Sequence, residues 1–170
     1  MMSNLAKKAG ILLLLGGCLL FPLSAANISF LVIETGVREE DRANESSTIW
    51  ENGLMDVFFD AGHIVTNAPI MRLHENPSEE FPGEAQRELD EAFLGGAEFF
   101  VLALLDYQGI VPAANSVLNP RSVSLRLFST KPYKILYERT YPAGTSLRKN
   151  DRFSYAQNAA RLIVPFLRNR

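Results

Sequence analysis

An unbroken apolar run from Phe99 to Leu105, inside the segment Ala97–Gln108, constrains the fold more than any other part of the sequence. Gly95 and Gly96 precede the run and Gly109 closes the segment, so its length is that of a strand and too short for a separate helix. A strand that is apolar on both faces must be covered on both faces. The run therefore predicts an α/β fold in which this strand lies near the centre of a helix–sheet–helix sandwich.

The first 26 residues are expected to be a secretory signal peptide. Lys7 and Lys8 form a basic start, residues 11–23 are apolar, and Ser24-Ala25-Ala26 supplies the small residues of a cleavage site before Asn27. The apolar stretch is shorter than the ~20 residues that a spanning helix needs, so no transmembrane span is expected in the mature chain. The predicted organisation is a cleaved signal peptide over 1–26 and one domain over 27–170, exported to a bacterial periplasm.

Cys18 is the only cysteine, and it lies inside this segment. Leu15-Gly16-Gly17-Cys18 resembles a bacterial lipobox, in which the cysteine carries a lipid and becomes the new N-terminus. The apolar residues 19–23 favour the simpler interpretation, a cysteine within a signal peptide. Lipidation of Cys18, with a tether to the outer membrane, is the alternative. If cleavage follows Ala26, the mature chain has no cysteine and forms no disulfide.

The charge of the chain bears on the kind of partner. The formal net charge is −2, and loss of Lys7 and Lys8 would leave 15 basic and 19 acidic residues, a net charge of −4. Proteins that bind nucleic acid usually carry a basic stripe, which is not visible in this sequence. No nucleic-acid partner is therefore expected.

Periodicity and turn residues predict the remaining elements. Thr48-Ile49-Trp50-Glu51 has the spacing of a helix capping box, and Gly62 is placed to end that helix. Pro69 cannot donate to a sheet ladder, which puts its strand at an edge. Strands are expected at 28–33, 64–66, 99–105, 122–128 and 133–141, and helices over 48–61, 84–94 and from Asp151 to near Pro165.

This order of elements predicts one sheet. The first three strands are joined by helices and should be parallel, and the last two should add as an antiparallel meander. The expected fold is a three-layer α/β/α domain with a five-stranded mixed sheet of order 2-1-3-4-5, in which strand 4 is antiparallel.

Several segments resemble a known family of envelope domains. They are Glu34-Thr35-Gly36, the helix from Trp50, Gly95-Gly96-Ala97-Glu98-Phe99-Phe100-Val101, and the hairpin strands Val123–Phe128 and Lys134–Tyr137. Together they resemble the N-terminal domain of the TolB translocation protein and the related domains of curli-secretion (CsgG-like) and penicillin-binding-protein-activator lipoproteins. Glu98 stands where that family usually has aspartate. The resemblance implies an envelope-associated binding or assembly module rather than an enzyme, with another envelope protein as its partner.

Motifs for catalysis or metal binding are not visible in the sequence. His63 and His74 lack the spacing of a zinc site, and no serine lies in a Gly-x-Ser-x-Gly elbow. Gly36 follows the first strand without the further glycines of a phosphate-binding loop. We therefore predict no catalytic residue, no cofactor and no metal site.

One group of residues is a candidate binding surface. In a sheet of order 2-1-3, the switch point lies between the carboxyl ends of strands 1 and 3. The residues expected there are Glu34, Thr35, Gly36, Arg38, Asp106 and Tyr107. The simpler alternative is that they belong to ordinary surface loops.

The sequence thus predicts an exported, non-catalytic binding or assembly accessory of the cell envelope. Two other hypotheses remain open at this point. One is a subunit of an envelope secretion or peptidoglycan-synthesis complex, anchored by lipid at Cys18. The other is an exported small-molecule sensor or hydrolase that uses the switch point.

Overall fold

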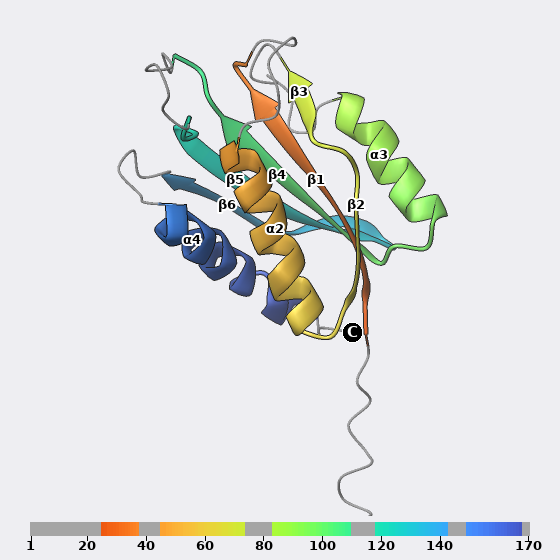
Figure 1. Ribbon diagram of the computed structural model, residues 1–170. Coiled ribbons are helices and arrows are strands. Elements are labelled where there is room, and N and C mark those ends of the chain that lie inside the picture. Colours follow the sequence, from red (N-terminus) through yellow and green to blue (C-terminus); the bar gives the residue numbers. More distant parts are fainter. Residues whose placement is uncertain (1–24, 38–44, 74–82, 110–117, 143–148, 168–170) are drawn as a thin grey trace, which may run out of the picture.

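The structure is a computed structural model that describes residues 25–37, 45–73, 83–109, 118–142 and 149–167 (Figure 1). Within these ranges no helix is long and apolar enough to cross a membrane. The elements in chain order are β1 (Asn27–Thr35), α2 (Glu45–Asp60), β2 (Ile64–Asn67), β3 (Met71–Leu73), α3 (Gly83–Leu94), β4 (Phe99–Asp106), β5 (Ser122–Thr130), β6 (Tyr133–Pro142), α4 (Lys149–Arg161) and the 3₁₀ helix η1 (Val164–Leu167).

The strands form one mixed sheet. Its order is β2-β1-β4-β5-β6, and β3 also pairs with β1, farther along that strand than β2 does. β1 is parallel to β2, β3 and β4, whereas β5 is antiparallel to both β4 and β6. The predicted mixed α/β sheet with β4 at its centre is confirmed.

The number of strands was predicted wrongly, because the sheet has six strands rather than five. The missing strand is β3, which follows an interruption at residues 68–70. Pro69 lies in that interruption and has no amide proton to donate. The edge chain therefore leaves β1 after Asn67 and pairs with it again from Met71.

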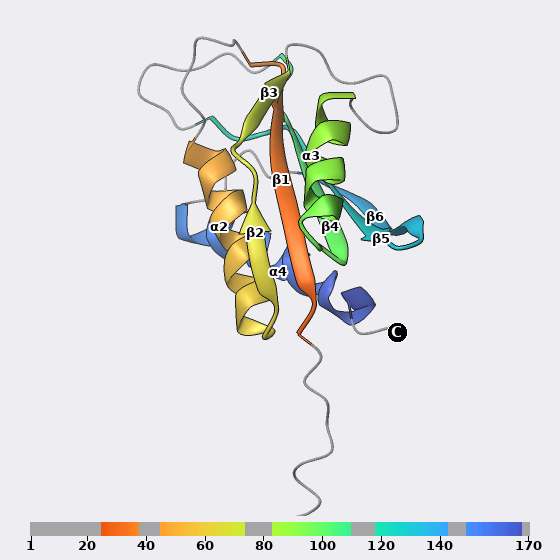
Figure 2. The ribbon, with the colours of Figure 1, turned by 90° about the vertical axis from the view of Figure 1, so that its right-hand side faces the viewer.

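Helices cover the two faces of the sheet unequally. α2 and α4 pack side by side on one face, and α3 lies on the other (Figures 1 and 2). The larger core cluster lies between the sheet and the α2–α4 pair, and it includes Trp50, which meets Tyr155 edge-on at 6.0 Å between ring centroids. A smaller cluster joins α3 to Leu31, Phe100 and their neighbours.

Three helix boundaries differ in how well they were predicted. α2 begins at Glu45, so Thr48 is an exposed residue inside the helix and the predicted capping box is wrong. At the other end, Gly62 has a φ of 84°, and the amide of His63 donates to the carbonyl of Phe58 at 3.1 Å, which closes the helix as expected. α4 ends at Arg161, four residues before Pro165, as the proline predicts.

Candidate functional site

The carboxyl ends of β1, β3 and β4 meet at one end of the sheet, which we call the switch-point rim. Thr35 and Asp106 are opposite each other in the parallel β1–β4 register. The amide of Tyr107 then donates to the carbonyl of Thr35 at 2.9 Å. Glu34, Thr35, Gly36, Asp106 and Tyr107 are therefore brought together as predicted, whereas Arg38 and Cys18 lie outside the described residues.

Glu34 is held inside the rim rather than presented on its surface. Its side chain is 1% exposed, and its Oε2 atom lies 3.2 Å from Nε of Arg72, which is 20% exposed. The two residues are directly opposite in the β1–β3 register. A buried carboxylate is tolerated only with a cationic or hydrogen-bonding partner. Glu34 and Arg72 therefore join the end of β1 to the edge of the sheet.

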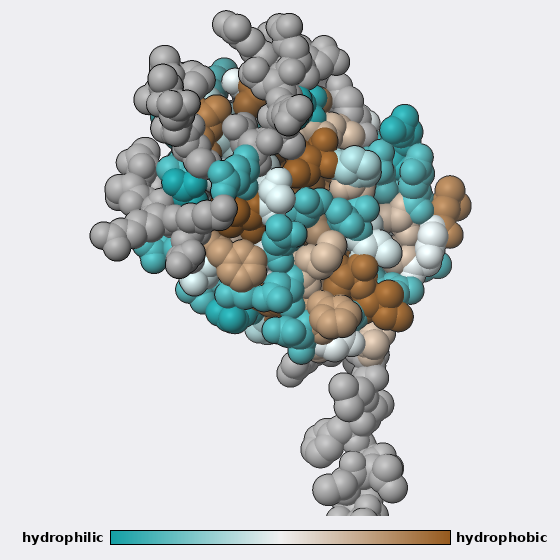
Figure 3. All heavy atoms as spheres, in the orientation of Figure 1, coloured by the Kyte–Doolittle hydropathy of each residue, from teal (hydrophilic) through white to brown (hydrophobic). Residues whose placement is uncertain are grey.

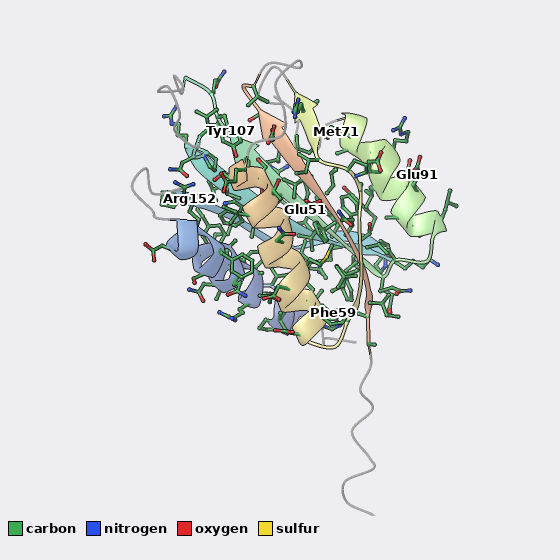
Figure 4. All side chains as sticks on the ribbon, viewed as in Figure 1. Glu51, Phe59, Met71, Glu91, Tyr107 and Arg152 are labelled. Atoms are coloured by element: carbon green, nitrogen blue, oxygen red, sulfur yellow. The ribbon has the colours of Figure 1, made fainter. Side chains whose placement is uncertain are left out.

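Tyr107 makes a second buried connection, from β4 to the first turn of α2. Its hydroxyl lies 2.8 Å from Oγ of Ser47, and both side chains are buried. Burial raises the pKa of Tyr107 well above the ordinary value for a phenol, although the hydrogen bond between Tyr107 and Ser47 acts in the opposite direction. The phenol is therefore neutral at physiological pH. In Figure 4, Tyr107 is labelled at this end of the sheet, with Met71 of β3 at the same end.

Gly36 allows the chain to leave β1 close against the end of β4. Its φ is 75°, and an added Cβ would lie 2.7 Å from both Cα and N of Gln108. Its amide donates to the carbonyl of Leu73 at 3.1 Å, which ties it to β3 as well. A larger residue would be strained here in backbone conformation and would also clash with Gln108.

The accessible part of the rim is formed by a smaller set of residues. Asp106 is half-buried, and its Oδ1 atom accepts from the amide of Gln108 at 2.9 Å. Gln108 and Arg121 are exposed, and the amide of Arg121 donates to the carbonyl of Asp106. Among the described residues at the end of β4, the polar side chains that a partner could touch thus include Asp106, Gln108 and Arg121, of which only Asp106 belongs to the predicted set.

The residues that secure the rim were missed because they come from distant segments. Ser47 precedes Tyr107 by 60 residues, and Arg72 follows Glu34 by 38. The sequence did contain one signal for Arg72. Glu34 lies near the end of an apolar strand, and a buried charge there needs a cation on a neighbouring strand. Nothing in the sequence identified Ser47.

The described histidine lies at the opposite end of the sheet from the rim. His63 is buried, and its Nδ1 atom accepts from the amide of Ala26 at 3.2 Å. The carbonyl of Ala26 in turn accepts from Ile64 at 3.0 Å, so Ala26 is buried and bonded on both sides. Among the described residues, no group of three or more His, Cys, Asp or Glu is arranged to hold a metal ion.

A family model described as "Uncharacterised protein" matches residues 27–127 of the chain. A search of proteins with curated descriptions finds no match. Several solved structures are similar in fold. A PelC dodecamer from Paraburkholderia phytofirmans is 13% identical, with 86% of this chain and 90% of that one covered and a TM-score of 0.46.

Two other structures are similar at the same level. The competence/damage inducible protein CihA from Agrobacterium tumefaciens is 11% identical, with coverage of 84% and 86% and a TM-score of 0.43. A DUF330 protein from Xanthomonas campestris is 9% identical, with coverage of 87% and 89% and a TM-score of 0.43.

These findings correct the resemblance drawn from the sequence. The similar structures are PelC, competence/damage proteins and a DUF330 protein, so the assignment to TolB-like, CsgG-like or penicillin-binding-protein-activator domains is wrong. The segments on which that resemblance was based reflect the fold rather than membership of the TolB-like group. Any parallel sheet with right-handed crossovers repeats the same order of strands and helices, and a glycine commonly separates a helix from the next strand.

Proposed function

We propose that this chain, which belongs to the family of uncharacterised proteins whose model matches residues 27–127, is an exported accessory protein of the bacterial cell envelope. It binds another envelope protein through the switch-point rim and catalyses no reaction. The observation that carries this proposal is the way the rim is built. Buried polar contacts fix the ends of β1, β3 and β4 and the first turn of α2, and among the described residues Asp106, Gln108 and Arg121 present polar side chains that a partner can reach.

A binding role fits the ionisable groups of the rim better than a catalytic one. A general base or nucleophile must reach the reacting atom of its substrate. Glu34 is instead buried against Arg72, and the phenol of Tyr107 is buried against Ser47. These two side chains hold the rim in place. The accessible groups are a carboxylate, an amide and a guanidinium, which are suited to hydrogen bonds and ion pairs with a protein surface.

Export rests on the sequence of the N-terminal segment. Its basic start, apolar middle and small residues before Asn27 are those of a secretory signal. We therefore expect the partner in the periplasm or on the inner face of the outer membrane.

Photo-crosslinking in the cell tests the proposal directly. A photoreactive amino acid is placed at Gln108, at Arg121 or, as a matched control, at Ser154, which is exposed on α4. We expect the same envelope protein to be captured at the first two positions and not at the third. Capture should also fall when Arg121→Glu is combined with the probe at Gln108. Absence of any adduct at the rim, or equal capture at all three positions, would exclude the rim as the binding surface.

A further inference from the structure

The side of β6 that faces away from β5, which we call the outer edge of β6, is an edge of the sheet. β6 is the last strand in the order β2-β1-β4-β5-β6, and among the described residues only β5 pairs with it. With ten residues it is also the longest described strand. Figure 2 shows the β5–β6 hairpin projecting on the side away from β2. A long sheet edge of this kind is a template for a further strand.

The strand register shows which residues direct their backbone groups to the outer edge. The amide of Thr130 donates to the carbonyl of Glu98, so the even-numbered residues of β5 bond to β4 and the odd-numbered ones bond to β6. The residues of β6 that are opposite these odd-numbered residues are Tyr137, Arg139 and Tyr141. Glu138 and Thr140 lie between them and therefore direct their amides and carbonyls away from the sheet.

Basic side chains predominate along this edge. Lys131, Lys134 and Arg139 are all exposed. The one acid of β6, Glu138, is paired with Arg126, with 2.7 Å between Oε1 and Nε. The chain as a whole has a formal net charge of −2. The edge is thus a locally basic strip on an acidic chain, and it favours a strand that carries carboxylates.

The same charges disfavour a second copy of this chain as the occupant. Pairing two copies of β6 brings the basic residues of one edge beside those of the other, and like charges on facing strands are destabilising. β6 also bulges at Leu136, because Ile135 and Tyr137 are opposite consecutive residues of β5. Lysines and bulges protect a sheet edge from another apolar edge. They leave the regular residues after the bulge accessible to an acidic strand.

The surface beside β6 is polar as well. The hydroxyl of Tyr155 on α4 donates to the carbonyl of Pro142 at 3.1 Å, which places α4 next to the end of β6. Figure 3 shows hydrophilic side chains over α4, and the exposed residues described in this helix are Asp151, Ser154, Asn158 and Arg161. Carboxylates of a strand bound here stay among hydrated groups, so they avoid the high cost of moving a charge into apolar surroundings.

We propose that the outer edge of β6 binds an extended, acidic segment of a partner protein as an additional strand of the sheet. The bound strand exchanges main-chain hydrogen bonds with Glu138 and Thr140. Its carboxylates lie opposite Arg139 and, on the other side of the bulge, Lys134. The main-chain bonds supply affinity, and the basic side chains select an acidic segment. The inference does not depend on what the switch-point rim binds.

Binding of a defined peptide to the full chain tests the proposal. The probe is a short, blocked, fluorescein-labelled peptide of alternating valine and glutamate, and binding is followed by fluorescence anisotropy. We expect saturable binding that weakens as salt is added, and no binding of the peptide in which lysine replaces glutamate. N-methylation of the central amides of the acidic peptide should also abolish binding, because it removes the donors of the added strand.

Two substitutions at Thr140 separate the backbone amide from the side chain. Thr140→Pro removes the outward amide and Thr140→Val keeps it, whereas both remove the hydroxyl that bonds to Ser124 at 2.8 Å. Proline is tolerated in an edge strand where the amide faces solvent, and circular dichroism checks that both variants fold. We expect Thr140→Pro to weaken binding of the acidic peptide by about tenfold and Thr140→Val to leave it unchanged.

A pair of charge variants tests the choice of an acidic strand without altering the backbone. Lys134→Gln combined with Arg139→Gln should weaken binding of the acidic peptide by about tenfold at low salt. Arg87→Gln combined with Arg161→Gln, at exposed positions on α3 and α4, should leave it unchanged. Equal affinity for the acidic and the basic peptide overturns the proposal, as does equal loss in the two charge variants. A dimer of the chain that Thr140→Pro dissociates also overturns it, because the occupant is then a second copy.

Discussion

At the scale of single residues, the switch-point rim depends on two polar side chains that are removed from water. Glu34 is compensated by Arg72 and Tyr107 by Ser47. A buried polar group that loses its partner costs more free energy than the bond itself contributes. Substitutions at these four positions should therefore act first on stability, and through it on any partner binding at the rim.

Tyr107→Phe should change how stability depends on alkaline pH. The ordinary pKa of tyrosine is about 10, and burial raises the pKa of Tyr107 in the folded protein. Above about pH 10 the unfolded chain releases this proton while the folded chain keeps it, so the free energy of unfolding falls as pH rises, by up to about 1.4 kcal/mol per pH unit. Below about pH 10, Tyr107 keeps its proton in both the folded and the unfolded chain, so it does not affect how the free energy of unfolding changes with pH.

The measurement is urea denaturation between pH 8 and pH 11. Tyr107→Phe should cost about 1 kcal/mol at pH 8, from the lost hydrogen bond to Ser47, and should show a shallower alkaline decline than the parent. Tyr133→Phe is the matched control, because Tyr133 is 56% exposed. An unchanged decline in Tyr107→Phe would show that this phenol ionises as freely in the folded chain as in the unfolded one.

The rim residues also show where inference from the sequence stops. The predicted strand order was sufficient to place Glu34 near Asp106, because neighbouring parallel strands end at the same edge of the sheet. Burial was not predictable in the same way. It depends on Arg72 and Ser47, which reach the rim only after the chain has folded. The exposed Gln108 and Arg121 carried no pattern that distinguishes a binding surface from a loop.

At the scale of elements, the contact between α2 and α4 is unusually close at one point. A Cβ added to Gly53 would lie 2.7 Å from Cβ of Ala156. Glycine is unfavourable inside a helix by about 1 kcal/mol relative to alanine. Its presence here is explained by the approach of the second helix, which leaves no room for a side chain.

Gly53→Val should therefore destabilise the protein by on the order of 2 kcal/mol, since added volume in a packed interface forces the helices apart. Ala156→Gly in the same chain should recover part of that loss, which a double-mutant cycle in urea measures as a coupling energy. Asn52→Val is the control, because Asn52 is the exposed neighbour of Gly53 on α2. If the changes in unfolding free energy caused by Gly53→Val and Ala156→Gly simply add, the close contact does not limit how α2 packs on α4.

Elements with long, regular patterns were predictable, and the short or interrupted ones were not. The apolar run of β4 and the glycines after α2 and α3 specify their elements locally. β3 has only three residues after Pro69, too few for a period of two to be visible. The start of α2 was set by tertiary contacts, since Ser46 and Ser47 are buried against Asn119 and Tyr107.

At the scale of the whole molecule, the sheet separates two apolar clusters of unequal size. The cluster under α2 and α4 draws residues from every strand except β3, whereas the one under α3 is smaller. Both contain residues of β1 and β4, which alternate between the two faces. Because these strands are common to both, the clusters should form and break together.

Leu54→Ala and Leu89→Ala test this cooperativity. Leu54 is fully buried in the larger cluster and Leu89 nearly so in the smaller one. We expect losses of about 3 and about 2 kcal/mol, each in a single urea transition with an unchanged slope. Leu162→Ala, at an exposed position, should cost less than about 1 kcal/mol. A separate early transition in Leu89→Ala would show that α3 unfolds independently of the rest.

If the chain is exported as we propose, the hydrogen bonds of Ala26 affect the order in which it folds and is processed. Ala26 is buried at the start of the sheet, bonded to His63 and Ile64, and it is also the last residue of the expected cleavage site. A peptidase must bind this stretch in an extended, accessible form. In the folded domain, Asn27 at the start of β1 is paired with Ile64 of β2, so this stretch is already bound within the sheet. Under the proposed export, folding and cleavage would compete for the same residue, and a precursor that folds first would be expected to keep its leader.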